Sequence, residues 1–197
     1  ICTLEIFMKI LRLANTQSNS HIYGPGNRFV IWTQGCSLEC PGCWNKEFWS
    51  FDAGYDQSVD ELVIDIKKND EIEGITILGG EPLEQSEAIL SLIKTIKHYG
   101  LSVMLYTGFE EEELNNTQLE CINLSDIVIM GRYIASLRDT SLRWRGSSNQ
   151  QIKLISDVYS DLEIDEREEV EVTLDPDGKV SMVGYPQKWL LNLLNDL

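Results

Sequence analysis

The chain has 197 residues, enough for one domain with a hydrophobic core, and its 43% apolar and 24% charged residues are typical of a soluble globular protein. Its net charge of −16 repels polyphosphate backbones, so we expect no nucleic-acid partner. No apolar run approaches the roughly 20 residues that span a bilayer, and the start lacks a signal-peptide cleavage pattern. We therefore expect a cytoplasmic protein without a membrane segment.

The first half of the chain is predicted to alternate strands and helices. The apolar stretch at 1–13 favours a first strand, although Met8 opens a more ordinary start, and residues 1–7 are interpreted either as an upstream extension or as residues foreign to the natural chain. The polar segment 15–28 ends in a Gly-Pro-Gly turn and favours a loop. Residues 29–35 are rich in β-branched and aromatic side chains, which predicts a buried strand.

Further along, residues 58–69 and 86–100 have the apolar spacing of amphipathic helices. Residues 74–82 and 101–108 are predicted strands, and a further strand is predicted at 126–131. Strands that alternate with helices in this way are typical of parallel βαβ units, so we expect an α/β fold. The glutamates of 109–114 favour a helix start.

The last part of the chain has a different pattern. Residues 169–184 resemble a hairpin around the turn at 175–178, and 186–197 have the pattern of an amphipathic helix. The acidic run at 161–171 is interpreted as a solvated face with an edge hairpin, and the alternative is a lid or a docking surface.

Three of the five cysteines lie within eight residues. Cys36, Cys40 and Cys43 have the spacing C-x3-C-x2-C directly after a predicted strand. Clustered thiols in a cytosolic chain favour metal binding or catalysis over disulfides. The chain has only two histidines, which weakens mixed Cys/His zinc sites and Cys–His catalysis.

Thiolates are suited to iron–sulfur clusters or to zinc. Three thiolates leave one iron of a cubane without a protein ligand, and a substrate can bind at that open position. Structural zinc normally takes four ligands, and the remaining Cys2 and Cys121 form no pair. Zinc with a distant fourth ligand, or three unrelated reduced cysteines, are the alternatives.

A second motif, Gly79-Gly80-Glu81-Pro82, ends a predicted strand. A glycine pair lets the backbone approach a ligand closely. Because the carboxyl ends of parallel strands meet at one edge of a sheet, we expect this motif to lie beside the cysteine loop.

At these residues the chain resembles the radical S-adenosylmethionine superfamily. Within it, the segments GPGNR, WTQGC and CPGCWN resemble the activating proteins of anaerobic ribonucleoside-triphosphate reductase, as do LYTGF, GRY and RWRGSSNQ further on. The match covers roughly residues 22–151. We therefore treat 1–197 as a single domain with its core at about 22–151 and a C-terminal extension over about 152–197.

The resemblance implies an incomplete (βα) barrel of the radical S-adenosylmethionine type, with a parallel sheet and a small C-terminal hairpin and helix. It implies a 4Fe–4S cluster and S-adenosylmethionine as cofactors, and reductive cleavage to a 5′-deoxyadenosyl radical that takes a hydrogen atom from a glycine. The implied partners are an anaerobic ribonucleotide reductase or similar glycyl-radical enzyme, and an external one-electron donor such as flavodoxin or ferredoxin.

The resemblance also assigns roles to individual residues. Cys36, Cys40 and Cys43 would be the cluster ligands. The residues expected to border or hold the S-adenosylmethionine are Gly42, Trp44, Gly79, Gly80, Glu81 and Thr107. Arg28 would serve structure or contact with a partner, and a plain surface arginine is the alternative.

Two positions depart from the family pattern. Met130 stands where the family often has an Asp before glycine, and Tyr23 stands where many glycyl-radical activases have an Asp. Two alternative functions stay open on the sequence. One is a small radical enzyme acting on a small molecule or peptide, for example resembling 7-carboxy-7-deazaguanine synthase, and the other is a structural metal-binding interaction module.

Overall fold

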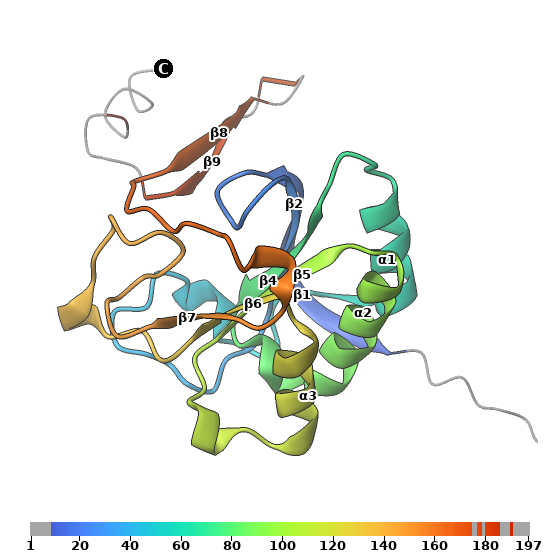
Figure 1. The fold of residues 1–197 in the computed structure, drawn as a ribbon, viewed down its shortest axis with the longest axis horizontal. Helices are drawn as coiled ribbons and strands as arrows, with labels where there is room; N and C mark the ends of the chain where they lie inside the picture. The colour runs from blue at the N-terminus through green and yellow to red at the C-terminus, as the bar shows by residue number, and fades with distance from the viewer. Residues whose placement is uncertain (1–8, 175–176, 179, 186–189, 191–197) are drawn as a thin grey trace, which may run out of the picture.

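A computed structural model describes residues 9–174, 177–178, 180–185 and 190. Its centre is a seven-stranded sheet with the strand order β3-β1-β2-β4-β5-β6-β7 (Figure 1). The strands are β1 Ile10–Ser20, β2 Arg28–Thr33, β3 Tyr55–Ser58, β4 Gly74–Gly79, β5 Ser102–Thr107, β6 Ile127–Met130 and β7 Gln151–Leu154.

The middle of the sheet is parallel. Strands β2, β4, β5 and β6 pair in parallel, whereas β1, β3 and β7 are antiparallel to their neighbours. The predicted α/β fold with a parallel centre is confirmed. The sheet is open, with β3 and β7 as its edge strands. The antiparallel strands β1, β3 and β7 flank the parallel centre and do not belong to the pattern of alternating strands and helices.

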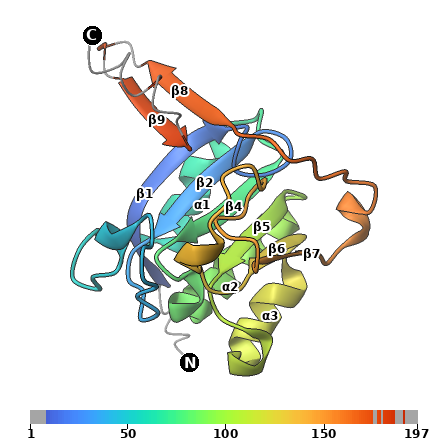
Figure 2. The same cartoon turned by 90° about the vertical axis from the view of Figure 1, so that its left-hand side faces the viewer.

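Three helices cover one face of this sheet (Figure 2). They are α1 Val59–Lys67, α2 Ser86–His98 and α3 Asn116–Leu124. Alternate strand residues such as Ile31, Ile77 and Leu105 pack against them in the main core, because successive side chains of a strand point to opposite faces. The other face carries Val30, Trp32 and loops instead of helices.

Some elements differ from the sequence-based expectation. Strand β1 continues to Ser20, through half of the predicted loop at 15–28, because its polar residues pair along β2 with two register shifts. The glutamates of 109–114 form only a 3₁₀ turn at Glu111–Glu113, and α3 begins after Asn115, whose side chain caps the helix in a capping box.

The predicted C-terminal hairpin is confirmed. Strands β8 Val170–Leu174 and β9 Val180–Gly184 pair antiparallel in a separate two-stranded sheet. The predicted closing helix at 186–197 lies outside the described residues, apart from position 190.

In the part of the chain that the structure describes, no helix has the length and apolar character needed to cross a bilayer.

Candidate functional site

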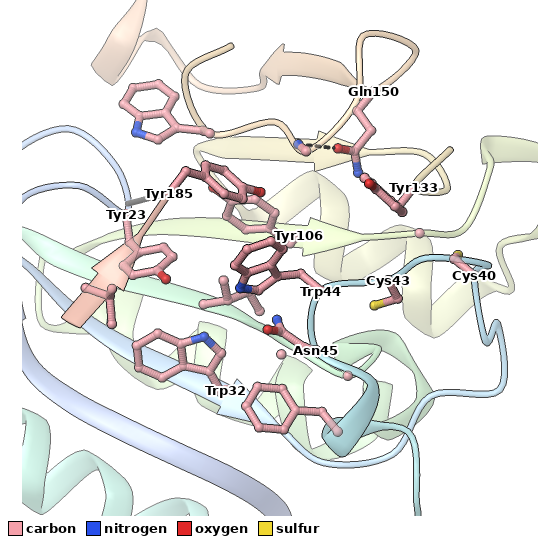
Figure 3. Close-up of a pocket in the computed structure, with 18 of the residues that line it drawn as sticks. Tyr23, Trp32, Cys40, Cys43, Trp44, Asn45, Tyr106, Tyr133, Gln150 and Tyr185 are labelled. Atoms are coloured by element: carbon pink, nitrogen blue, oxygen red, sulfur yellow. Dashed lines mark hydrogen bonds between the residues drawn. The ribbon is translucent and has the colours of Figure 1, made fainter. Parts of the chain in front are cut away.

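One cavity of about 440 Å³ lies where the cysteine loop meets the carboxyl ends of β2, β4 and β5 (Figure 3). A cavity of this size lies in the range of small-ligand and cofactor sites. Eight of the nine residues expected to hold the cluster and the cofactor line it: Cys36, Cys40, Cys43, Trp44, Gly79, Gly80, Glu81 and Thr107. Gly42 is not among its lining residues.

The cysteine loop begins where β2 ends, and backbone hydrogen bonds fix its base. The Gly35 amide donates to the Phe48 carbonyl at 2.9 Å, and the Cys36 amide donates to the Trp49 carbonyl at 3.0 Å. Between the first two cysteines, Glu39 has a φ of 42°, which is uncommon for a residue with a side chain. The loop is therefore a tightly turned segment whose two ends are held together.

All three thiols are free, and they differ in exposure. Cys36 is buried, and Cys40 and Cys43 are partly exposed. Burial raises the pKa of the Cys36 and Cys40 thiols, so both favour the protonated form until a metal displaces the proton. Among the described residues, no three His, Cys, Asp or Glu side chains converge to hold one metal ion. In a 4Fe–4S cluster the three thiolates would bind three different irons, and the observation that fits such a cluster is that all three cysteines line one cavity.

The glycine pair of the second motif brings β4 against the start of the cysteine loop. A Cβ on Gly80 would lie 2.3 Å from the Gly35 carbonyl oxygen, and a Cβ on Gly79 would lie 2.4 Å from the Thr33 nitrogen. The Gly80 amide donates to the Thr33 carbonyl and the Glu81 amide to the Gly35 carbonyl, both at 2.8 Å. Close packing of backbone against backbone within the protein therefore requires glycine at both positions.

The Glu81 side chain is almost fully buried, and its carboxylate is bonded within the protein. Oε1 accepts from the Leu83 amide and the Thr107 hydroxyl, each at 2.9 Å, and Oε2 accepts from the Gly108 amide at 2.7 Å. Burial raises the pKa of this carboxyl to about 7, against these three hydrogen bonds. Glu81 and Thr107 thus join the ends of β4 and β5 at the floor of the cavity.

Gly42 and Trp44 are the two other loop residues that were expected to border the cofactor, and they occupy different positions. Gly42 has a φ of 78°, and a Cβ there would come 3.0 Å from the Ala135 Cβ, so this glycine serves the turn of the loop. Trp44 lines the cavity and is 58% exposed, so its indole stands at the mouth rather than at the floor.

The burial of two further residues, Arg28 and Cys121, shows which role each of them has. Arg28 is fully buried and donates to Thr76, Ser102, Tyr159 and the Ile75 carbonyl, so it is structural and not a surface arginine. Cys121 is buried in the main core on α3, as expected for a small apolar side chain, and does not line the cavity.

Apart from Tyr23 and Trp44, the sequence did not single out the aromatic residues that line the cavity. Tyr23 and Trp32 meet edge to face with ring centroids 5.2 Å apart, and Tyr106 and Tyr185 also line the space (Figure 3). Trp32 and Tyr106 lie on the strand face opposite the helices, so the alternation within the predicted strands was the signal that could have located them.

Residues 22–153 match the family described as a 4Fe-4S single cluster domain. Anaerobic ribonucleoside-triphosphate reductase-activating proteins of Escherichia coli and Haemophilus influenzae are each 34% identical over 139 residues, which cover 66% of this chain and 90% of the relative. The protein of that name from Enterobacteria phage T4 is 34% identical over 138 residues, covering 66% and 86%. Among solved structures, QueE from Escherichia coli has a TM-score of 0.40 at 20% identity, over 50% of this chain and 52% of that one.

The cysteine loop and the family match define an iron–sulfur protein with a single 4Fe–4S cluster domain. More narrowly, the chain belongs to the family of anaerobic ribonucleoside-triphosphate reductase-activating proteins, which are enzymes of the glycyl-radical activase type.

Proposed function

We propose that this chain binds its 4Fe–4S cluster through Cys36, Cys40 and Cys43 and uses it to install a glycyl radical on an anaerobic ribonucleotide reductase. The observation that supports this proposal is the convergence of all three thiols and the Gly79–Glu81 motif on one cavity. When bound, the cluster supplies one electron that cleaves S-adenosylmethionine to methionine and a 5′-deoxyadenosyl radical.

The protein's own residues bind, orient and enclose the cofactor. Gly79 and Gly80 would border the amino-acid part of S-adenosylmethionine, while Glu81 and Thr107 would keep that border in place through their hydrogen bond. Trp44 would cover the cofactor at the mouth. Gly42 would act indirectly, since its positive φ sets the turn between the second and third cysteines.

The proposed partners follow from the family. The relatives are named for activating anaerobic ribonucleoside-triphosphate reductase, which favours that reductase as the protein substrate. An external one-electron donor, flavodoxin or ferredoxin, would reduce the cluster. A cytoplasmic location remains a prediction of the sequence.

The ligand assignment is tested by Cys40→Ala after anaerobic reconstitution. We expect this variant to lose most of its iron and sulfide and to release no 5′-deoxyadenosine with dithionite and S-adenosylmethionine, because one of three ligands is gone. The matched control is Cys121→Ala, which removes a thiol from the core away from the cavity and should keep the wild-type iron content. A Cys40 variant that releases the nucleoside at the wild-type rate would refute the assignment.

The substrate is tested separately. Wild-type chain, S-adenosylmethionine and reductant are mixed with anaerobic ribonucleotide reductase, and the glycyl radical is measured by electron paramagnetic resonance. A radical doublet on the reductase supports the proposal, whereas nucleoside release without any radical on the reductase contradicts it.

A further inference from the structure

The C-terminal extension supplies part of the cavity wall. The family match ends at residue 153, and the extension then passes along the body to the β8–β9 hairpin (Figure 1). Six residues from this extension line the cavity together with the cysteines: Arg167, Glu169, Met182, Val183, Gly184 and Tyr185. One side of the site is therefore built by residues beyond the family match.

Specific polar contacts hold the extension in this place. The Glu171 carboxylate accepts hydrogen bonds from the Gln17 side chain, the Ser20 hydroxyl and the His21 amide, which lie in the last part of β1 and just beyond its end. Arg143, whose side chain is only 12% exposed, pairs with Asp165 at 3.2 Å. The Glu171 carboxylate is thus engaged with the body, whereas the Asp165 side chain remains 54% exposed, in keeping with the solvated-face interpretation of residues 161–171.

Tyr185 is the residue that the extension presents at the mouth. Its ring meets Trp44 edge to face with centroids 5.6 Å apart (Figure 3). The Arg138 guanidinium lies 4.8 Å from the Trp44 ring and 5.8 Å from the Tyr185 ring. The mouth is thus framed by two aromatic rings and a cation that contacts both.

Arg138 adds a second property to this mouth. It forms no ion pair or hydrogen bond with another side chain in the described part of the chain, although the protein carries a net charge of −16. A guanidinium has five N–H donors and no acceptor, so its donors can reach the carbonyl oxygens of an entering peptide. Flat aromatic rings beside it can pack on peptide planes and Cα hydrogens.

We propose that Tyr185 is a substrate-binding residue that, with Trp44 and Arg138, recognises the main chain of the protein-substrate segment entering the cavity. This inference rests on the proposed function. It adds the chemistry of the partner, which is a peptide segment bound through its backbone. Tyr185 acts on the binding of this segment rather than on the cluster.

The experiment compares Tyr185→Ala, Tyr185→Phe and wild type in the reconstituted enzyme. We expect Tyr185→Ala to raise the KM for the reductase about tenfold and to raise the ratio of 5′-deoxyadenosine released to glycyl radical formed. The dissociation constant of the cluster-loaded chain for the reductase, measured by fluorescence anisotropy, should rise by a similar factor. Tyr185→Phe keeps the ring and should restore values within about twofold of wild type.

Leu174→Ala is the matched control, because Leu174 lies on the same hairpin, is 69% exposed and does not line the cavity. Unchanged KM, dissociation constant and ratio in Tyr185→Ala would overturn the inference. So would a fall in kcat with no change in KM, since that would place Tyr185 on the cofactor. If the wild-type enzyme forms no glycyl radical at all, the proposed function itself fails and this inference fails with it.

Discussion

At the scale of single residues, Glu81 shows how one buried side chain can join two strand ends at a site. Its carboxylate receives three protein donors from Leu83, Thr107 and Gly108. The side chain therefore fixes the ends of two neighbouring strands at the cavity.

The raised pKa of Glu81 predicts a pH dependence of stability. The folded-state pKa of about 7 lies above the usual 4.5, so ionisation favours the unfolded chain. Stability from this group is fully present below pH 4.5 and is lost as the pH rises through 7. Relative to Glu81→Gln, wild type should lose roughly 2 kcal/mol between pH 5 and pH 7.

Urea unfolding of the cluster-free chains at both pH values measures this difference. Glu81→Gln should be the less stable protein at pH 5, because its amide nitrogen faces a donor at Gly108, and the gap between the two should narrow as the pH rises. Stability curves that run parallel across this range would show that Glu81 does not titrate as described.

At the scale of elements, the site depends on how closely β4 approaches the start of the cysteine loop. The end of β4 lies against the backbone of Thr33 and Gly35, and two amide donors cross between them. The cysteine loop is held from its other side by Phe48 and Trp49. The two motifs therefore form one packed unit, although more than 30 residues separate them in the chain.

A methyl group at Gly80 should disrupt this unit. Its Cβ would lie 2.3 Å from the Gly35 carbonyl oxygen and 2.9 Å from that of Phe48, and backbone atoms cannot move aside as side chains do. We expect Gly80→Ala to lower the free energy of unfolding by about 3 kcal/mol. It should also lower the iron content after reconstitution, because the cysteine loop has to shift.

Gly108→Ala is the matched control for this substitution. The close contact of a Gly108 Cβ would be with the end of the flexible Leu38 side chain, at 2.5 Å, so a loss of about 1 kcal/mol is expected. Equal losses in both variants, measured by urea unfolding, would argue against the close approach as the cause.

At the scale of the whole molecule, the extension has two parts with different roles. Tyr159 and Leu162 pack on the buried cluster of Met104, Ile127 and Ile129, on the sheet face without helices. The Tyr159 hydroxyl also accepts from the buried Arg28 guanidinium at 3.2 Å. The hairpin that follows contributes part of the cavity wall and is bonded to the end of β1 through Glu171.

Two truncations should separate these roles. Deletion from residue 156 onward removes the apolar cover and an Arg28 partner, and should lower the free energy of unfolding by about 3 kcal/mol. Deletion from residue 170 onward keeps the apolar cover and the Arg28 partner, and it should lower the free energy of unfolding by about 1 kcal/mol. Chemical denaturation of the two truncated chains checks this, and equal losses would contradict the division.

Much of the molecule was predictable because local pattern and local structure agree. The strands at 29–35, 74–82 and 101–108 and the helices at 58–69 and 86–100 were found from apolar spacing, and all lie in the central parallel sheet or on it. The short strands β3 and β7 were not found. They are stabilised by backbone pairing with β1 and β6, which a local sequence pattern does not reveal.

The cysteine spacing and the Gly-Gly-Glu motif determined, on the sequence alone, the class of chemistry and its family, because ligand type and spacing within one loop are local properties. Only the tertiary structure decided which groups face the cavity. It held the Glu81 carboxylate of the cavity lining in three internal hydrogen bonds and left Gly42 outside that lining. It also brought Tyr185 against Trp44 across 140 residues of chain. Such contacts depend on how distant segments pack, and no local pattern of residues records that packing.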